Sequence, residues 1–312
     1  MKIDVFSHIM PEKYLSIYRK RVPAIEDEIE VYTRPVVDLQ MRLSLMARYP
    51  DVLQMLTVAK VPLEKYVDPK VAVELARIAN DELAELLVKH PDKFFGAAAC
   101  LPMNDIDAAL EEADRAITQL KLQGVQIYTR IKGERLDSPK FRPLFEKMAK
   151  YRLPIWIHPE TNDALDWDGG LYSWPFETTS AMMRLVKMGL FYDYPDLKFI
   201  VHHAGAMVPF FADRLKWYVS ASKVFLENEP AIYEHFRRFY VDTALYGNTS
   251  ALQCSYDYYG ADHMLFGTDA PLGPRWGMIE GTIKSIERMA IPEEDKEKIF
   301  STNAIEMFKL AL

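Results

Sequence analysis

The stretch Lys2–His8, KIDVFSH, is a short apolar run that ends in a histidine, and the rest of the chain repeats this pattern. Helix-forming segments separate the apolar runs, several of which are nearly continuous. Such runs are typical of parallel strands that are covered on both faces. The sequence therefore predicts parallel strands at residues 2–8, 52–59, 94–102, 124–129, 153–159, 198–203, 239–244 and 263–269.

These eight predicted strands, each followed by a helical segment, indicate an α/β protein of the (β/α)8 TIM-barrel type. Asp68 and Pro69, for example, form a helix-start pair. An open doubly wound sheet uses the same units, but HIMPEKY after the first strand lacks the glycines of a phosphate loop. We predict one barrel domain over residues 1–312. Residues 11–34 and 160–176 are predicted to be loop insertions at its C-terminal face.

Composition excludes several classes of function. The chain has 312 residues, 49% of them hydrophobic, and can bury a large core. Its net charge of −7 and the lack of a basic run argue against a nucleic-acid partner. The apolar runs are too short to span a membrane, and Asp4 and His8 interrupt any signal-peptide segment. Because Cys100 and Cys254 form no paired motif, we expect a cytoplasmic globular protein with no membrane partner.

Ionisable side chains stand at the C-terminal ends of four predicted strands. They are His8, His158, the pair His202 and His203, and Asp269. Each alone has an ordinary structural explanation, such as a satisfied polar group or a turn cap. In a barrel, however, these strand ends meet at one mouth, where active sites lie. Imidazole and carboxylate are ligands for zinc, manganese or iron, so the sequence predicts a divalent-metal site there.

His202 and His203 are adjacent, and successive side chains of a strand point to opposite faces. Only one of the two is therefore expected to point into the barrel. AGAMVPF follows His203 and allows a tight turn. We assign the inward position to His203 and expect His202 to point away from the barrel axis.

Five segments together resemble the amidohydrolase-2 family of the amidohydrolase superfamily in order and spacing. The resemblance spans nearly the whole chain and implies a distorted (β/α)8 barrel. It also implies one divalent metal, Zn²⁺ or Mn²⁺, no organic cofactor, and assembly as a homodimer or higher homo-oligomer. The segments are IDVFSHIMP (3–11), IWIHP (155–159), YPDLKFIVHHAGAMVPFFADRL (194–215), FYVDTALYG (239–247) and LFGTDAPLGP (265–274).

The resemblance implies that His8, His158 and Asp269 are metal ligands. His203 matches the family's acid/base histidine, and Asp269 is a second candidate for moving the proton. The family usually has His-x-His or Glu-x-His on the first strand, whereas this chain has Phe6 at the first of these positions, and phenylalanine cannot ligate a metal. We favour three protein ligands plus water. Recruitment of His203 as a fourth ligand, and weak metal binding with a changed activity, are the alternatives.

Three residues are candidate substrate contacts. The resemblance places Arg42 where a family decarboxylase binds a substrate carboxylate, and the alternative is a charge on a helix surface. Arg130 follows the fourth predicted strand and can reach the mouth. Trp174 follows the fifth strand and is expected either to line an apolar or aromatic pocket or to pack beneath a loop.

The expected activity is non-oxidative decarboxylation of a small aromatic or unsaturated carboxylic acid by a metal-dependent lyase. The same site can serve a metal-dependent hydrolase of an amide, lactone or ester, or a hydratase, because metal-bound water needs a similar ligand set. A barrel that binds a ligand without turnover is the alternative from another class. Phe6 favours that alternative, whereas the intact His8, His158, His203 and Asp269 argue against it.

Overall fold

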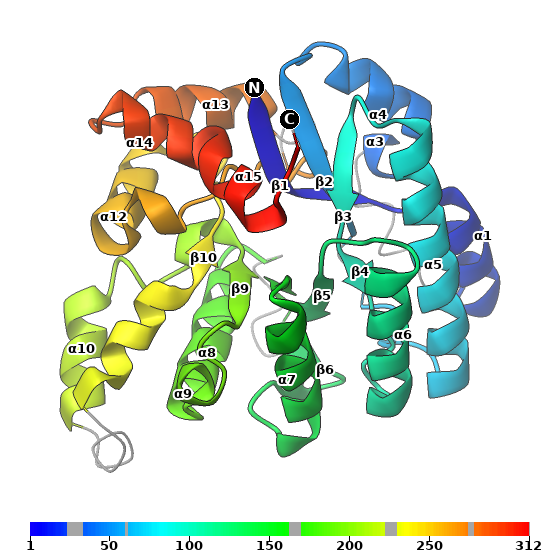
Figure 1. Cartoon of the computed structure of the whole chain (residues 1–312), viewed down its shortest axis with the longest axis horizontal. Helices are drawn as coiled ribbons and strands as arrows, with labels where there is room; N and C mark the ends of the chain where they lie inside the picture. Colours follow the sequence, from blue (N-terminus) through cyan, green and yellow to red (C-terminus); the bar gives the residue numbers. More distant parts are fainter. Residues whose placement is uncertain (24–33, 60–61, 162–169, 222–229, 274–277, 312) are drawn as a thin grey trace.

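The structure is a computed structural model that describes residues 1–23, 34–59, 62–161, 170–221, 230–273 and 278–311. Parallel strands stand at its centre (Figure 1). These strands are β1 (Lys2–Ile9), β2 (Val52–Val58), β3 (Phe94–Ala97), β4 (Ala99–Cys100), β5 (Val125–Tyr128), β8 (Pro154–His158), β9 (Lys198–Val201) and β10 (Tyr240–Val241). An antiparallel hairpin, β6 (Arg130–Ile131) with β7 (Glu134–Arg135), follows β5.

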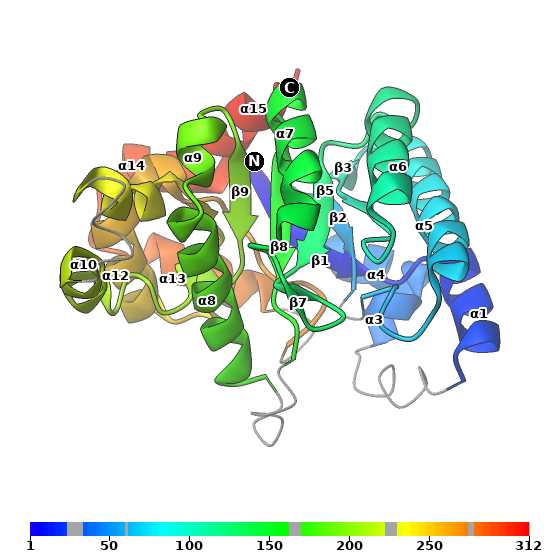
Figure 2. The ribbon, with the colours of Figure 1, turned by 90° about the horizontal axis from the view of Figure 1, so that it is seen from below.

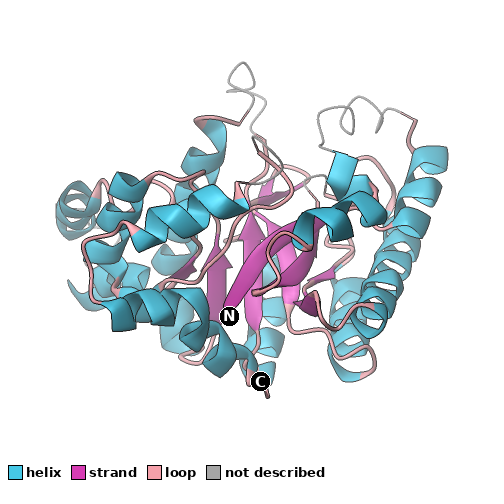
Figure 3. Ribbon diagram, turned by 90° about the horizontal axis from the view of Figure 1, so that it is seen from above, coloured by secondary structure: helices cyan, strands magenta, loops and turns pink. Residues whose placement is uncertain are grey.

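Helices surround the strands (Figure 3). The α-helices are α1 (Glu12–Arg21), α3 (Arg34–Val37), α4 (Leu39–Met46), α5 (Pro69–Lys89), α6 (Ile106–Thr118), α7 (Arg142–Tyr151), α8 (Ser173–Lys187), α9 (Leu190–Asp193), α10 (Ala212–Ala221), α12 (Thr249–Tyr259), α13 (Ile279–Glu287), α14 (Glu293–Glu297) and α15 (Asn303–Phe308). Short 3-10 helices are η1 (Pro139–Phe141), η3 (His203–Gly205), η4 (Pro230–Arg238) and η5 (Ala261–His263), and η6 (Lys298–Thr302) is a π-helix. In the described part of the chain, no helix is both long and apolar enough to cross a bilayer.

The strands pair in parallel in two groups, β1-β2-β3 and β10-β9-β8-β5-β4. The chain runs from β3 directly into β4, which joins the groups on one side. On the other side, residues 264–270 lie between β10 and β1. There Leu265 N–H donates to the Val241 carbonyl at 2.8 Å, and the Phe266 carbonyl accepts from Val5 N–H at 2.8 Å. The sheet is thus closed, and the predicted α/β barrel is confirmed.

The eighth predicted strand is an irregular closing segment. Met264 forms an isolated bridge with Val241. Beyond it, Asp269 has a left-handed φ of 63°, which a regular strand does not contain. The segment still holds β1, because Asp269 N–H donates to the Phe6 carbonyl at 3.0 Å and His8 N–H donates to the Ala270 carbonyl at 2.7 Å.

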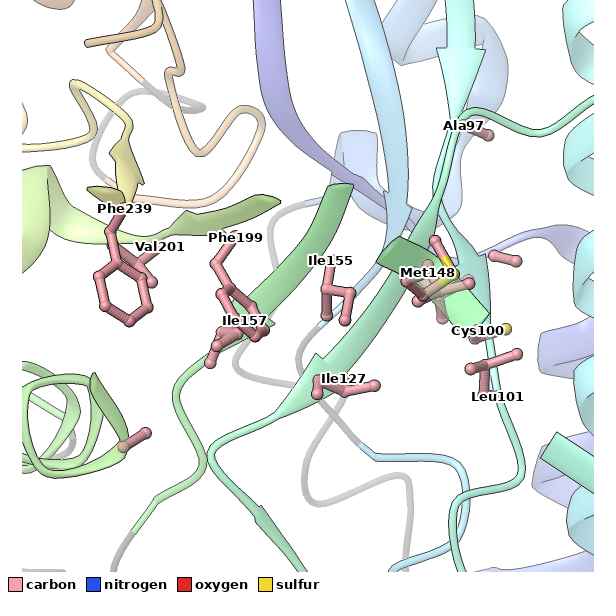
Figure 4. Close-up of a cluster of buried hydrophobic side chains, with 14 of the residues drawn as sticks. Ala97, Cys100, Leu101, Ile127, Met148, Ile155, Ile157, Phe199, Val201 and Phe239 are labelled. Carbon is pink, nitrogen blue, oxygen red and sulfur yellow. The ribbon is translucent and has the colours of Figure 1, made fainter. Parts of the chain in front are cut away.

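Side chains of β8 divide between two cores. Ile155 and Ile157 point to the same side as Phe199, toward the surrounding helices (Figure 4). Trp156 belongs to the separate core inside the barrel, where its indole N–H donates to the Val5 carbonyl at 2.9 Å. Alternation then places His158 on the inner face as well. Both termini lie at one end of the barrel (Figure 2), so the strands finish at the opposite end.

Two segments predicted to be loops contain helix. Helix α1 lies within 11–34, and α8 begins inside 160–176, at Ser173. The start of α1 has no side-chain cap from its own sequence. Instead, Glu82 of α5 accepts from the N–H groups of Lys13 and Tyr14 at 2.9–3.1 Å. Residues 24–33 and 162–169 of these insertions lie outside the described residues.

Candidate metal centre

Four buried side chains converge inside the C-terminal mouth of the barrel: His8 from β1, His158 from β8, His202 just after β9, and Asp269 from the closing segment. Candidate ligand atoms of the three histidines lie within 4.8 Å of one another. His8 Nε2 and His202 Nε2 lie 3.0 and 3.1 Å from the same Asp269 oxygen, Oδ1. Each of these four residues is at most 2% exposed. The structure therefore brings together three residues predicted as ligands and adds His202.

Hydrogen bonds fix the orientation of two of these rings. His158 Nδ1 lies 2.7 Å from the Pro159 carbonyl, which can only accept, so this nitrogen carries the proton. The Thr57 hydroxyl donates to the Ser7 carbonyl at 3.1 Å and therefore accepts from His8 Nδ1 at 2.8 Å. Because each neutral ring has one proton, Nε2 of both histidines keeps a lone pair for a cation.

His202 is oriented in the same way, but by a carboxylate. Its Nδ1 donates to Asp242 Oδ2. The other oxygen of Asp242 accepts the N–H groups of Ala204 and Ala244 at 3.0 and 3.1 Å. Asp242 is fully buried, so these bonds hold its position firmly. Nε2 of His202 is left facing Asp269.

The donor set fits a divalent cation. His8 Nε2 is buried, its contact with Asp269 does not have hydrogen-bond geometry, and it has no other partner among the described residues. A buried nitrogen without a partner is costly, and a cation bound to it would remove that cost. Imidazole nitrogens beside a carboxylate are the ligands that zinc and manganese accept.

The charge states of the cluster also suit metal binding. Burial lowers the pKa of His8 and holds the pKa of His158 well below its usual value. Burial alone would raise the pKa of Asp269, but the adjacent His202 holds it well below its usual range. Burial alone would lower the pKa of His202, but Asp242 and Asp269 raise it to about 10. Near neutral pH, His8 and His158 are thus neutral and Asp269 is ionised, as ligation requires.

The backbone around the site is strained. His203, Ala204, Ala206, Tyr246 and Asp269 all have φ between 50° and 63°, in the left-handed region that residues other than glycine rarely adopt. Such strain collects at functional sites. Two of these residues contact each other, since the Tyr246 hydroxyl donates to Asp269 Oδ2 at 2.7 Å. The other oxygen of Asp269, Oδ1, then faces His8 and His202.

The prediction that His202 points away from the barrel is wrong. Ile200 belongs to the core inside the barrel, so alternation along β9 places His202 on the inner face as well. The left-handed φ of His203, just after the strand, then turns the second histidine toward the site. Both histidines therefore reach the site, with ring centroids 4.1 Å apart. Burial, followed by the effect of His202, lowers the pKa of His203 to about 4. His203 is neutral near pH 7, and its buried Nδ1 has no hydrogen-bond partner among the described residues.

Phe6 occupies the position on the first strand where the family resemblance predicts a metal ligand. Its ring is fully buried and stacks on His202, with ring centroids 4.0 Å apart and planes inclined by 10°. It also meets His8 edge-on, at 5.4 Å between centroids. An apolar ring therefore stands where a ligand was expected.

Arg42 is buried, so the alternative of a helix-surface charge is wrong. It is 1% exposed and donates to the His8 carbonyl, to Ser7 Oγ at 2.9 Å and to Gln54 Oε1 at 2.8 Å. Burial lowers its pKa to about 10. Its two terminal nitrogens are thus used by β1 and β2, and they hold the backbone of a candidate metal ligand.

Arg130 and Trp174 border the site differently. Arg130 forms a two-point ion pair with the buried Glu177, at 2.8 and 3.2 Å. Trp174 stands in the first turn of α8, with its ring 6.1 Å from His203 and nearly parallel to it, and 6.3 Å from His158. Trp174 therefore forms part of the wall of the site, whereas Arg130 already has a carboxylate partner.

Sequence reasoning assigned no role to Asp242, Thr57 or Tyr246. Asp242 and Tyr246 both lie in FYVDTALYG, the segment after the seventh predicted strand. An acidic residue at another strand end was a usable signal for Asp242. Thr57 ends an ordinary apolar run and carried no such signal.

Fold and site together define a (β/α)8 barrel with a buried histidine–carboxylate cluster suited to a metal ion. The chain belongs to the amidohydrolase family, because the model of that family, described as "Amidohydrolase", matches residues 33–310. The predicted resemblance is thereby confirmed.

Known proteins share this organisation. The γ-resorcylate decarboxylase of a Polaromonas species is 30% identical and aligns over 99% of this chain and 98% of its own length. The 6-methylsalicylic acid decarboxylase of Penicillium expansum is 30% identical over 78% of each chain. A crystal structure of a Polaromonas dihydroxybenzoic acid decarboxylase with bound manganese and the inhibitor 2-nitroresorcinol has a TM-score of 0.83 and 29% identity, covering 100% of this chain and 97% of that one.

Proposed function

We propose that this chain is a metal-dependent lyase that decarboxylates a small aromatic or unsaturated carboxylic acid without redox change. The observation that carries the proposal is the buried cluster in an amidohydrolase-type barrel, where His8 lies close both to His158 and to Asp269. The relatives described above are aromatic acid decarboxylases by name, which supports this activity over the hydrolase and hydratase alternatives.

His8, His158 and Asp269 are the residues that would hold one divalent metal. When bound, the metal would polarise the substrate carboxylate or a neighbouring hydroxyl and stabilise the charge that develops during C–C cleavage. Manganese in the Polaromonas structure supports Mn²⁺, and the ligand types are equally suited to Zn²⁺. We propose no organic cofactor, because the metal would stabilise the charge that develops on the substrate.

The protein's own groups move one proton. As the C–C bond breaks, its electron pair stays on the substrate carbon, which takes a proton while CO₂ leaves. We assign this transfer to His203 or Asp269. His203 Nδ1 is buried without a described partner, and the ring is neutral near pH 7, so it can take a proton from water or a substrate hydroxyl and deliver it to carbon.

The wall of the site supports a flat substrate. Trp174 lies nearly parallel to His203, and an aromatic acid can stack against such a surface. Arg130 stays a candidate for the substrate carboxylate, which would compete with Glu177 for the guanidinium. We assign Arg42 to supporting His8, because its terminal nitrogens are occupied.

The test is a product assay on metal-loaded protein. Hydroxybenzoates and carboxymuconate-type acids are screened for CO₂ release together with formation of the decarboxylated product. We expect equal amounts of both, loss of activity after chelation, and recovery with Mn²⁺ or Zn²⁺. Hydrolysis of amides, lactones or esters without CO₂ would instead assign the hydrolase alternative. Metal binding without turnover of any of these substrates would assign a ligand-binding barrel.

We also propose that the whole chain, residues 1–312, acts as one cytoplasmic domain that assembles as a homodimer or larger oligomer. Exposed aromatic side chains on α8 and α10, including Phe176, Trp217 and Tyr218, support assembly. The free cysteines Cys100 and Cys254 support a reducing compartment. Light scattering tests the assembly, since a particle of 36.1 kDa would be a monomer.

A further inference from the structure

An aromatic ring and an imidazole stack on each other in this site. Phe6, on β1, stands where a first-strand ligand was expected, and it stacks flat on His202 at 4.0 Å. His202 follows β9, and its Nε2 lies 3.1 Å from Asp269 Oδ1. The site has therefore lost a ligand from one strand and has a buried imidazole from another.

The position of His202 is that of a neighbouring ligand. Two atoms that each bind one cation at about 2.1 Å lie about 3.0 Å apart in octahedral coordination and about 3.4 Å apart in tetrahedral coordination. His8 Nε2 and His202 Nε2 lie 3.0 and 3.1 Å from Asp269 Oδ1. His202 also lies within 4.8 Å of both His8 and His158, measured between candidate ligand atoms.

Asp242 sets the tautomer that ligation needs. Oδ2 of this buried carboxylate accepts from His202 Nδ1 and keeps the proton on that nitrogen, so a cation that displaces the second proton of the ring, on Nε2, finds the lone pair there. Its Oδ1 is held by the N–H groups of Ala204 and Ala244, so the carboxylate cannot turn away. A carboxylate that accepts the second N–H of a histidine is the usual support of a metal-bound imidazole.

The geometry points to His202 as a fourth metal ligand that replaces the ligand absent at Phe6, with Asp242 as its positioning residue. The resulting set is three imidazole nitrogens and one carboxylate. A candidate ligand atom of His203 also lies within 4.8 Å of those of His202 and Asp269, and we leave this histidine for proton transfer because its buried Nδ1 has no partner among the described residues. This inference rests on the proposed function, because both require the cation, and it differs from the three-ligand set by one residue.

The first experiment compares neighbouring histidines. The apo forms of the wild type, His202→Phe and His203→Phe are titrated with Mn²⁺ and Zn²⁺ against a chromophoric chelator, and circular dichroism checks folding. Phenylalanine keeps a flat ring in the stack. We expect His202→Phe to lose about 100-fold or more in affinity and His203→Phe to stay within about threefold. Equal affinities of the two variants, or a larger loss in His203→Phe, would overturn the inference.

If His202→Phe folds poorly, a double variant that exchanges the two stacked rings provides the same test. Phe6→His combined with His202→Phe preserves one phenyl and one imidazole ring in the stacked pair. We expect this double variant to bind the metal at least tenfold more tightly than His202→Phe does. The Co²⁺ form of the wild type should show the absorption spectrum of a site with three imidazoles, and that of His202→Phe a site with two. A Co²⁺ spectrum unchanged by His202→Phe contradicts the proposal.

Asp242→Asn tests the positioning role. The amide oxygen would keep the N–H bonds of Ala204 and Ala244, so its NH₂ group would face His202 Nδ1. That nitrogen would then have to accept, and the proton would move to Nε2 and block ligation. We expect a loss of metal affinity similar to that of His202→Phe. Wild-type affinity in this variant would exclude Asp242 from the positioning role.

The outcomes separate this inference from the proposed function. Wild-type protein that binds neither metal would overturn both. Wild-type protein that binds metal and releases CO₂, together with unimpaired metal binding by His202→Phe, would overturn this inference alone.

Discussion

The two ends of the barrel interior differ sharply in polarity, although the same strands supply both. Near the start of the strands the interior is apolar, as at Ile3 and Trp156. Two residues beyond Trp156, about 7 Å along the strand, is His158 in the polar mouth. The apolar end supplies stability without chemistry. The polar end supplies chemistry, and its buried nitrogens and carboxylates lose solvation that a cation would offset.

The largest effect is expected from a substitution at the polar end of the barrel interior. Asp269→Ala removes the carboxylate shared by His8 and His202, so we expect loss of bound metal and a fall in kcat/KM of about 10³-fold or more. Elemental analysis and CO₂ assays measure the two effects. The matched variant is His203→Ala, for which we expect a loss of about 10²–10⁴-fold in activity with the metal retained. Loss of metal from His203→Ala would show that His203 is a ligand and not the proton-transfer group.

Trp156→Ala tests the apolar end. The side chain is fully buried inside the barrel, so its removal leaves a cavity and should lower the free energy of unfolding by about 3–5 kcal/mol. Urea denaturation of the metal-loaded protein measures this. Val88→Ala on α5, where the side chain is 82% exposed, should change stability by less than about 0.5 kcal/mol. Similar losses in the two variants would contradict the assignment of Trp156 to a structural core.

Removing the metal tests whether the two ends of the barrel interior contribute independently to stability. A ligand at 100 times its Kd stabilises the folded state by about 2.7 kcal/mol, so chelation should lower Tm reversibly. Calorimetry with and without Mn²⁺ measures the shift. Trp156→Ala should show the same metal-dependent shift as the wild type, because its cavity lies outside the cluster. A shift confined to the wild type would mean that the two ends are energetically coupled.

The smallest expected effect concerns a carboxyl outside the cluster. Glu64 is 2% exposed, one of its oxygens has no partner among the described residues, and burial raises its pKa to about 8 from 4.5. Between these values the folded state holds a proton that the unfolded state has released, so stability falls as pH rises from 4.5 to 8. Glu64→Gln should therefore be about 1–3 kcal/mol more stable than wild type at pH 8.5 and similar to it at pH 5.

Urea denaturation at the two pH values measures this difference. The control is Glu111→Gln, at an exposed position of α6, which should change stability equally at both. An equal effect of Glu64→Gln at pH 5 and pH 8.5 would show that Glu64 does not titrate in this range.

The fold was predictable because it depends on local patterns. Apolar runs located β1, β2, β5, β8 and β9 to within a few residues. Asp68 and Pro69 start α5 as expected, with the Asp68 carboxylate accepting from Val71 N–H at 3.0 Å. The single mouth of a barrel was also sufficient to predict that His8, His158 and Asp269 lie at the same end of the molecule.

The remaining features depend on partners far away in the sequence. Helix α1 is capped by Glu82, 69 positions beyond Lys13. The left-handed turn at His203, which brings this second histidine into the site beside His202, is followed by Ala204, whose N–H donates to Asp242, 38 positions later. Arg42 is buried because its acceptors lie on β1 and β2. No local pattern in the sequence contains this information.

The closing segment that carries Asp269 is also the seam of the barrel. Its backbone is fastened to β1 through the Phe6 carbonyl and the His8 N–H. The Asp269 carboxylate and the His8 imidazole are therefore held 3.0 Å apart by main-chain bonds that also help to close the barrel. A local opening between the closing segment and β1 would separate Asp269 from His8. The cluster could therefore be lost while most of the helices stay folded.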